Sequence, residues 1–284
     1  MLFCSDIPPL RAWRAQVRRA SQRVALVPTM GALHQGHLAL VGLARQLADR
    51  VVLSVFVNPL QFGPAEDLAR YPRDLDRDRR LADESGVDLL FAPAEEAMYP
   101  PGSEIRVHGG ATAARWEGAV RPGHFDGVLT VVTKLFHLVE PEVAVFGQKD
   151  IQQATLIRRL ARDFDLPVAI AVGPTVREAD GLALSSRNAY LSPAGRREGL
   201  GLIQALRAAA RRWSEGEHRA DRLAAVLQET LAGFPGLTPD YIAIVDPERF
   251  EPVTEARVGT IVALAARVGS TRLIDNHILG TELP

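Results

Sequence analysis

The sequence predicts an α/β protein, with a Rossmann-like parallel sheet in its N-terminal part and a smaller α+β domain after it. Short apolar runs alternate with amphipathic runs up to about residue 172, as in a parallel sheet with helices between its strands. The run at 51–57 (VVLSVFV) is almost unbroken, as in a strand buried on both faces. After Gly173-Pro174 the pattern changes to helices followed by short strands. We therefore predict domains over residues 1–174 and 175–284.

Local patterns predict the elements of the first domain. Leu10, Trp13 and Val17 recur at spacings of three and four and predict an opening amphipathic helix over 9–20. The remaining apolar and amphipathic runs predict strands at 24–27, 51–57, 87–91, 143–146 and 168–172, and helices at 38–47, 74–85 and 151–163. Prolines and glycines make 92–125 mainly loop, with a short strand at 105–107. Residues 126–139 are expected to be helical or mixed, because their β-branched cluster opposes a helix.

The second domain is expected to contain two helices and three strands. Alanine- and arginine-rich runs predict helices over 194–213 and 219–232, separated by the polar turn 214–218. Strand-like runs follow at 241–245, 260–265 and 271–274. This pattern predicts a fold class and no function.

The composition is typical of a soluble globular protein. Of 284 residues, 47% are hydrophobic and 24% charged, and the mean hydropathy is +0.01. With 33 basic and 34 acidic residues, no global charge favours nucleic acid or an anionic membrane. The single cysteine, Cys4, excludes an intramolecular disulfide framework and fits a reducing compartment. No signal-peptide pattern or long apolar run is present. We expect a cytoplasmic enzyme without a membrane or nucleic-acid partner.

The stretch 28–37 (PTMGALHQGH) carries the strongest functional signal. It lies between a predicted strand and a predicted helix, where doubly wound folds bind nucleotide phosphates. Gly31 and Gly36 lack a Cβ atom, so the backbone can approach a ligand closely. His34 and His37 would lie one turn apart near the positive end of the helix, which favours an anion. A satisfied surface pair or a metal site are the alternatives, and no further ligands at familiar spacing support the metal.

His34-Gln35-Gly36-His37 resembles the HIGH signature of the adenylyl-transferring superfamily, which holds the phosphates of ATP. The longer string PTMGALHQGH resembles the pantothenate synthetase, or pantoate–β-alanine ligase, family. The resemblance implies ATP contacts along the whole stretch, by Met30, Gly31, Ala32, Leu33, His34, Gln35, Gly36 and His37. It covers residues 24 to about 191 through five ordered strings, and more diffusely the end of the chain (TRLIDN, 271–276).

A second string, VNPLQFG, follows the strand at 51–57. Asn58 and Gln61 come after the carboxyl end of that strand, an edge where open α/β sheets bind ligands, although Asn-Pro is also a common turn starter. The string resembles the substrate loop of the family, in which the glutamine matching Gln61 contacts both pantoate and β-alanine. A carboxamide suits carboxylate substrates because it carries no repelling charge.

The acidic residues from Asp74 to Asp78 are expected mainly to favour a helix N-terminus. The resemblance implies that one of them, near Asp78, helps to hold Mg²⁺ through the ATP phosphates. Arg77 interrupts a run that is often more acidic in the family.

Residues 147–153 (GQKDIQQ) form the second strong string. Lys149, at the exit of a predicted strand, could place a point charge on a phosphate, or could be an ordinary surface lysine. The string resembles a family motif in which Gly147, Gln148, Lys149 and Asp150 contact ATP. The residue matching Gln153 holds pantoate. Gln148 and Ile151 stand where the family often has glutamate and an aromatic residue.

Beyond Gly173-Pro174, the string LSSRN is similar to the flexible ATP-binding loop of the family. On its own Ser-Ser-Arg is a common loop sequence. The resemblance implies ATP contacts by Leu184, Ser185, Ser186 and Arg187, and a backbone contact by Val176. Arg121, in the family string RPGHF, could contact an anion.

The resemblance implies an ATP-dependent ligase that joins pantoate to β-alanine through a pantoyl adenylate. His37 would donate a proton, while His34, Lys149 and Mg²⁺ would stabilise phosphate charge. A homodimer is implied too. The alternatives are a nucleotidylyltransferase acting on a phosphorylated acceptor and a non-catalytic nucleotide-binding regulator. A tRNA-charging enzyme is disfavoured, because no basic anticodon-binding domain is evident.

Overall fold

The computed structural model describes residues 1–64 and 68–283. By contacts the chain divides into two compact units. The N-terminal unit comprises Met1–Gly147 and Leu156–Pro174, and the C-terminal unit comprises Gln148–Thr155 and Thr175–Pro284. The contacts thus group residues 148–155 with the second unit, whereas the predicted domain boundary at residue 174 stays a prediction.

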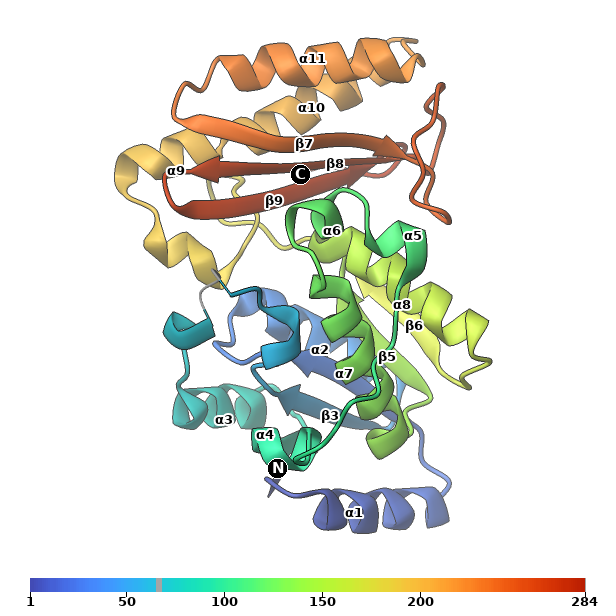
Figure 1. The fold of residues 1–284 in the computed structure, drawn as a ribbon. Helices are drawn as coiled ribbons and strands as arrows, with labels where there is room; N and C mark the ends of the chain where they lie inside the picture. Colours follow the sequence, from blue (N-terminus) through green and yellow to red (C-terminus); the bar gives the residue numbers. More distant parts are fainter. Residues whose placement is uncertain (65–67, 284) are drawn as a thin grey trace. The chain divides into compact units, whose positions relative to one another are not determined.

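A six-stranded parallel sheet forms the centre of the N-terminal unit, in the order β1-β4-β3-β2-β5-β6 (Figure 1). Its strands are β1 (Leu2–Cys4), β2 (Val24–Thr29), β3 (Arg50–Val55), β4 (Leu89–Phe91), β5 (Val143–Gly147) and β6 (Ala169–Gly173). The predicted Rossmann-like sheet is therefore confirmed. The strand β1 was not predicted, because three residues are too few to establish a period.

Helices cover both faces of this sheet, which explains the continuous apolar runs. α1 (Ile7–Arg19) and α7 (His124–Val139) pack on one face, and α2 (Gln35–Leu47) packs on the other. The other helices before residue 174 are α3 (Leu75–Glu84), α4 (Glu95–Met98), α5 (Gly110–Ala113), α6 (Glu117–Val120) and α8 (Ile151–Asp163). Alternate residues of one strand serve opposite cores: Leu26 packs with residues of α1 and α7, while Ala25 and Val27 pack with residues of α2.

The sheet has a topological switch point between β2 and β5. The chain builds outward from β2 through β3 and β4, and then returns to add β5 on the other side of β2. Parallel α/β sheets bind ligands at the carboxyl ends of the strands that flank such a point. The loop 30–34 leaves β2 at this position, and Gly147 ends the neighbouring strand β5.

Two predictions for the segment before residue 140 were incomplete or wrong. Residues 126–139 are entirely helical, within α7, because twelve of the sixteen residues of this helix are buried and packing outweighs β-branched propensity. The predicted strand at 105–107 is wrong: these residues are extended chain without a strand partner among the described residues. The surrounding loop also contains the short helices α4, α5 and α6.

The C-terminal unit packs helices on an antiparallel sheet of order β7-β8-β9. Its elements are α9 (Pro193–Gly199), α10 (Gly201–Ser214), α11 (Ala220–Ala232), β7 (Leu237–Val245), β8 (Ile261–Val268) and β9 (Thr271–Ile278). The α+β prediction is confirmed, although the single helix predicted over 194–213 is divided at Leu200. A Cβ atom on Gly199 would lie 2.9 Å from Leu273, and one on Gly201 would lie 2.8 Å from Phe234. The two glycines thus permit close packing at the break.

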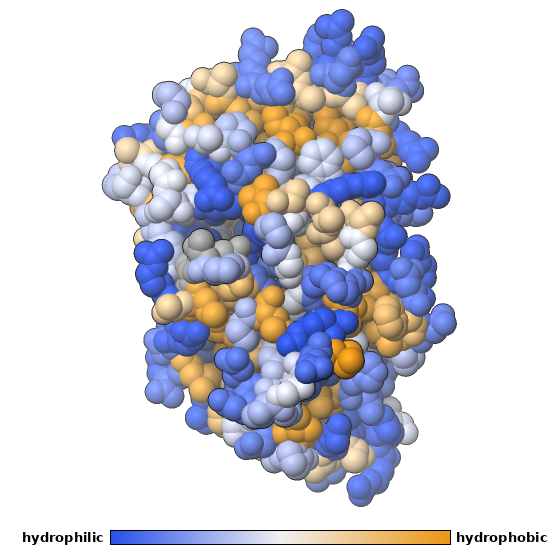
Figure 2. Space-filling view, viewed as in Figure 1, coloured by the Kyte–Doolittle hydropathy of each residue, from blue (hydrophilic) through white to orange (hydrophobic). Residues whose placement is uncertain are grey.

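The surface is mixed, with hydrophobic side chains scattered among hydrophilic ones on the face in Figure 2. Across the described ranges, no helix combines the length and apolar character needed to cross a membrane.

Candidate active site

The loop after β2 ends in a histidine pair that caps α2. His34 is the N-cap residue, and its Nδ1 accepts a hydrogen bond from the Gly36 amide at 3.2 Å. The His34 amide donates in turn to Nδ1 of His37 at 3.4 Å, so the two side chains form a reciprocal capping box. Their rings stack with centroids 4.0 Å apart. The predicted placement of the pair at the helix mouth is confirmed.

The capping contacts determine which nitrogen of each imidazole carries the proton. Because both Nδ1 atoms accept from amides, the neutral rings of His34 and His37 carry their hydrogen on Nε2. Both side chains can then donate a hydrogen bond through Nε2. The helix terminus adds its own N–H groups and positive dipole end, an arrangement that favours an anion.

Side chains of α3 hold the backbone of the loop between β2 and α2. Asp78 is 1% exposed, and its oxygens accept hydrogen bonds from the amides of Ala32 (2.9 Å) and Leu33 (2.8 Å). Arg77 donates to the Leu33 carbonyl at 3.0 Å. Ala32 has a positive φ of 51°, which is costly for a residue with a side chain and needs such anchoring. Gly31 has a φ of 81°, and a Cβ there would lie 2.8 Å from the Asp78 carboxylate.

Gln61 is held in a buried amide network behind the loop. It ends the short helix η1 (Pro59–Gln61), which Asn58 caps. The side-chain amide of Asn58 donates to Oε1 of Gln61 at 3.1 Å and to the Gly127 carbonyl at 3.0 Å. The Gln61 amide lies 2.9 Å from the sulfur of Met30, so the structure brings Gln61 beside the histidine loop.

Three further polar side chains complete this network. The Tyr99 hydroxyl donates to Oδ1 of Asn58 at 2.9 Å. Nδ1 of His124 and the Arg121 guanidinium contact the Gln61 carbonyl at 2.8 and 3.3 Å. Burial raises the pKa of Tyr99, which therefore stays a neutral donor at physiological pH. Arg121 thus contacts the backbone of the predicted substrate loop, a contact that its string RPGHF alone did not reveal.

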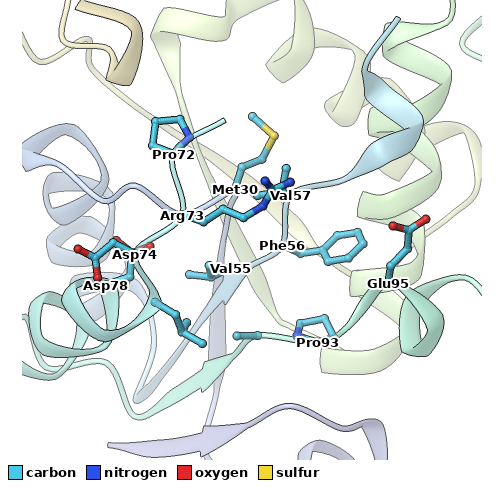
Figure 3. A pocket seen from close by; sticks show the side chains of 12 residues that line it. Met30, Val55, Phe56, Val57, Pro72, Arg73, Asp74, Asp78, Pro93 and Glu95 are labelled. Carbon is cyan, nitrogen blue, oxygen red and sulfur yellow. The ribbon is translucent and has the colours of Figure 1, made fainter. Parts of the chain in front are cut away.

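A cavity of about 300 Å³ adjoins Met30 beyond the carboxyl ends of β3 and β4 (Figure 3). Its apolar lining includes Val55, Phe56 and Val57. Its charged lining residues are Arg73, Asp74, Asp78 and Glu95. Its size is at the lower end of that of small-molecule sites. The cavity therefore combines an apolar wall with charged side chains of both signs.

In the C-terminal unit, β9 fixes the turn that carries Lys149. Residues Gln148–Asp150 form the short helix η3, and Lys149 lies 3.6 Å from the Asp150 carboxylate. The Asn276 side chain donates to the carbonyls of Gln148 (2.9 Å) and Lys149 (3.0 Å). Its Oδ1 accepts a hydrogen bond from the side-chain amide of Gln148 at 3.3 Å. Asn276 therefore holds the backbone of the predicted ATP-contacting turn.

The same strand anchors the hairpin that begins at Val176. Arg177 and Asp275 form a buried bidentate ion pair, with distances of 2.7 and 3.0 Å. Leu184 donates its amide to the Val176 carbonyl at 2.9 Å. Asn188 bonds the Glu178 carboxylate at 2.6 Å and the Ala183 carbonyl at 3.1 Å. These contacts bracket the predicted Ser185–Arg187 loop.

That loop itself is a short turn of helix. The helix η4 (Ser186–Tyr190) is capped by Ser185, whose hydroxyl accepts from the Arg187 amide at 3.3 Å. The hydrogen bond from Arg196 lowers the pKa of Glu178 below its ordinary value, so Glu178 stays ionised as the partner of Asn188. The ion pair of Glu178 and Arg196 thus supports the loop through Asn188.

The predicted residues divide between the two units. His34, His37 and Gln61 belong to the N-terminal unit; Lys149, Gln153, Val176 and the 184–187 stretch belong to the C-terminal unit. Gln153 lies in the first turn of α8 and is partly exposed. The positioning roles of Asp275 and Asn276 were missed, although the string TRLIDN already marked that segment.

The residues described provide few candidate ligands for Mg²⁺. Within 1–64 and 68–283, no three His, Cys, Asp or Glu side chains form a metal-binding group. Both oxygens of Asp78 already accept amide hydrogens.

Comparison with known proteins identifies the family. The family described as pantoate-beta-alanine ligase matches residues 3–278. Pantothenate synthetase from Syntrophotalea carbinolica is 48% identical over 283 residues, covering 100% of both chains. The crystal structure of pantothenate synthetase from Thermus thermophilus is 50% identical with a TM-score of 0.92, covering 98% of this chain and 99% of that one.

A third relative was solved with ligands bound. The structure of pantoate-beta-alanine ligase from Francisella tularensis, complexed with beta-gamma ATP and beta-alanine, is 33% identical with a TM-score of 0.81 over 100% of both chains. The family match spans nearly all of the sequence, and the similar structures include both units of the fold. The chain belongs to the pantoate–β-alanine ligase family.

Proposed function

We propose that this protein condenses pantoate with β-alanine at the expense of ATP, giving pantothenate, AMP and pyrophosphate. A carboxylate is a poor electrophile and must first be activated. A pantoate carboxylate oxygen attacks the α-phosphorus of ATP, and the bond to the β-phosphate oxygen breaks to release pyrophosphate. The β-alanine amine then attacks the carbonyl of the pantoyl adenylate, loses a proton and expels AMP.

The observation that carries this proposal is the stacked histidine pair at the α2 terminus, with Gln61 beside its loop. Charge grows on the departing pyrophosphate, where preorganised donors are most effective. His37 is the proposed donor of the hydrogen on its Nε2, as a hydrogen bond to the departing pyrophosphate, and His34 a hydrogen-bond donor to phosphate. Gln61 would bind pantoate and β-alanine, for which an uncharged amide is better suited than a carboxylate.

The C-terminal unit would supply the remaining ATP contacts. Lys149 would place its ammonium on phosphate, together with the backbone of Gly147–Asp150. Ser185, Ser186 and Arg187, with Leu184 and the Val176 backbone, would enclose the nucleotide. Gln153 would hold pantoate. Asn276 supports this assignment because it fixes the turn on which Lys149 stands.

Mg²⁺ would enter mainly through the ATP phosphates and would neutralise part of their charge. Asp78 would contribute its negative charge to the cation, through the carboxylate lone pairs that do not accept hydrogen bonds from the Ala32 and Leu33 amides. We also propose a cytoplasmic homodimer, in keeping with the single buried Cys4 and the resemblance.

Oxygen transfer tests the proposed activation directly. Pantoate labelled with ¹⁸O in its carboxylate should pass one labelled oxygen to AMP, since that oxygen bridges carbon and phosphorus in the adenylate. Mass spectrometry of AMP and pyrophosphate after turnover with β-alanine reads the outcome. Label in inorganic phosphate with ADP as product would indicate acyl phosphate chemistry instead. ATP cleavage that ignores pantoate would indicate a nucleotidylyltransferase.

A further inference from the structure

The guanidinium of Arg196, on α9, holds two carboxylates of the hairpin that begins at Val176. Its Nε donates to Asp180 and its Nη2 donates to Glu178, each at 2.7 Å. These hydrogen bonds lower the pKa of both carboxyl groups and raise the pKa of Arg196, so all three groups are charged at neutral pH. A forked contact of this kind fixes the geometry of both partners, which a single point charge would not.

The second oxygen of Glu178 reaches the loop that is proposed to enclose the nucleotide. It accepts a hydrogen bond from the side-chain amide of Asn188 at 2.6 Å, and the same amide donates to the Ala183 carbonyl at 3.1 Å. The Oδ1 atom of Asn188 is buried and has no hydrogen-bond partner among the described residues. The orientation of Asn188 therefore depends on its two N–H contacts, of which the one to a carboxylate is the stronger.

Asn188 belongs to the turn that carries Arg187. The backbone amide of Asn188 donates to the Ser185 carbonyl at 3.0 Å, and the Arg187 amide donates to the Ser185 hydroxyl at 3.3 Å. Hydrogen bonds thus connect Arg196, through Glu178 and Asn188, to the backbone of the turn. Arg196 itself lies outside every string from which the site was predicted.

We propose that Arg196 is a positioning residue for ATP binding. It fixes Glu178, and through Asn188 the Ser185–Arg187 turn keeps the shape that binds the nucleotide. The inference rests on the proposed ATP contacts of that turn. Without the guanidinium, the carboxylates of Glu178 and Asp180 repel each other, and Glu178 loses the contact that holds it. The turn would then adopt several shapes, and ATP affinity falls because binding has to order it.

Steady-state kinetics test these contacts. Arg196→Gln should raise the KM for ATP by about fivefold or more and change the KM for pantoate less than about twofold. Arg196→Lys should recover only part of the loss, because an ammonium cannot reach both carboxylates as the guanidinium fork does. Since Arg196 acts through Glu178, adding Glu178→Gln to Arg196→Gln should cost no more than about twofold beyond the larger single effect. Additive effects would contradict the proposal.

Two controls separate positioning from general stability. Arg197→Gln, at the exposed neighbouring arginine, should leave both KM values unchanged. Ile244→Val removes one methylene from the buried core of the same unit, so it should lower stability without raising the KM for ATP. A KM for ATP that rises in Ile244→Val as it does in Arg196→Gln would make the role of Arg196 structural only.

Limited trypsin digestion measures the shape of the turn without catalysis. Cleavage after Arg187, identified by mass spectrometry of the fragments, should be at least about fivefold faster in Arg196→Gln than in the wild type or Arg197→Gln. Arg187→Ala is the reference for the nucleotide contact and should itself raise the KM for ATP.

The outcomes distinguish this proposal from the proposed function. If Arg187→Ala raises the KM for ATP while Arg196→Gln does not, or if Arg196→Gln leaves the cleavage rate unchanged, the positioning role is overturned and the proposed function stands. If neither variant changes the KM for ATP, the proposed nucleotide contact of the turn fails together with the positioning role.

Discussion

His34 and His37 are constrained by the contacts that cap α2. Each Nδ1 accepts a backbone amide, which leaves Nε2 as the proton-bearing atom of the neutral ring. A positioned donor of this kind requires the loop before it to hold one shape. Asp78 provides that constraint from a helix more than forty residues further along the chain.

Replacing His37 by alanine should slow adenylate formation by roughly 10²–10⁴-fold, the usual contribution of a positioned acid. ATP affinity should fall much less, because other groups hold the phosphates. Rapid-quench measurement of pyrophosphate release checks this, with His137→Ala, an exposed histidine on α7, as the control. A rate within threefold of wild type would remove His37 from the chemistry.

Asp78→Ala leaves two buried amides without an acceptor and should lower the free energy of unfolding by about 1–3 kcal/mol. Urea denaturation measures the loss, and Asp76→Ala, exposed on the same helix, should cost far less. We expect turnover to fall while the Mg²⁺ concentration for half-maximal activity rises less than threefold. A large rise with unchanged stability would make Asp78 a metal ligand instead of a loop anchor.

At the scale of elements, β9 positions both segments of the C-terminal unit that are proposed to contact ATP. Asp275 pairs with Arg177 at the base of the hairpin, and Asn276 holds the turn of Lys149. His277 follows on the same strand and is 3% exposed. One strand therefore determines local geometry and also contains a buried titratable group.

Asn276→Ala should leave the carbonyls of Gln148 and Lys149 without their donor and loosen the turn. We expect a loss of about 1–3 kcal/mol in stability and a slower first half-reaction, with pantoate affinity nearly unchanged. Gln204→Ala, at an exposed amide on α10, provides the comparison. Equal kinetics in both variants would mean that the turn does not depend on β9.

Acid should destabilise the protein through His277. Burial, followed by the charge of Arg177, lowers the pKa of His277 to about 4, whereas the unfolded chain titrates near 6.5. Between these values only the unfolded state binds the proton, so stability falls as pH decreases, by about 3 kcal/mol in total. Urea denaturation of His277→Gln at pH 7.5 and 5 should lack this component, which His137→Gln should retain.

Much of this architecture was predictable from the sequence, for reasons that differ between elements. The strand at 51–57 and the loop at 28–37 could be predicted from local sequence. The unbroken apolar run of the first indicates burial on both faces, and the glycines of the second indicate a turn. The full extent of helix α7 could not be predicted, because burial of most of its residues outweighs the low helix propensity of its β-branched residues. The partners of Asp78, Asn276 and Arg121 could not be predicted, since each contact joins residues more than forty positions apart.

At the scale of the whole molecule, the proposed ATP contacts are divided between two units with separate cores. The histidine pair and Gln61 belong to one, and Lys149 with the 184–187 stretch to the other. In the proposed two-step reaction, the water-sensitive anhydride must stay bound until the amine arrives.

Incubation with ATP, Mg²⁺ and pantoate, leaving β-alanine out, tests this account most directly. Pyrophosphate should appear in a burst of about one equivalent per active site and then nearly stop, as expected when the bound adenylate is shielded from water. Radiolabelled pyrophosphate should exchange into ATP only when pantoate is present, and adding β-alanine should release AMP and pantothenate together. Exchange without pantoate, or turnover that does not respond to β-alanine, would contradict the proposed reaction.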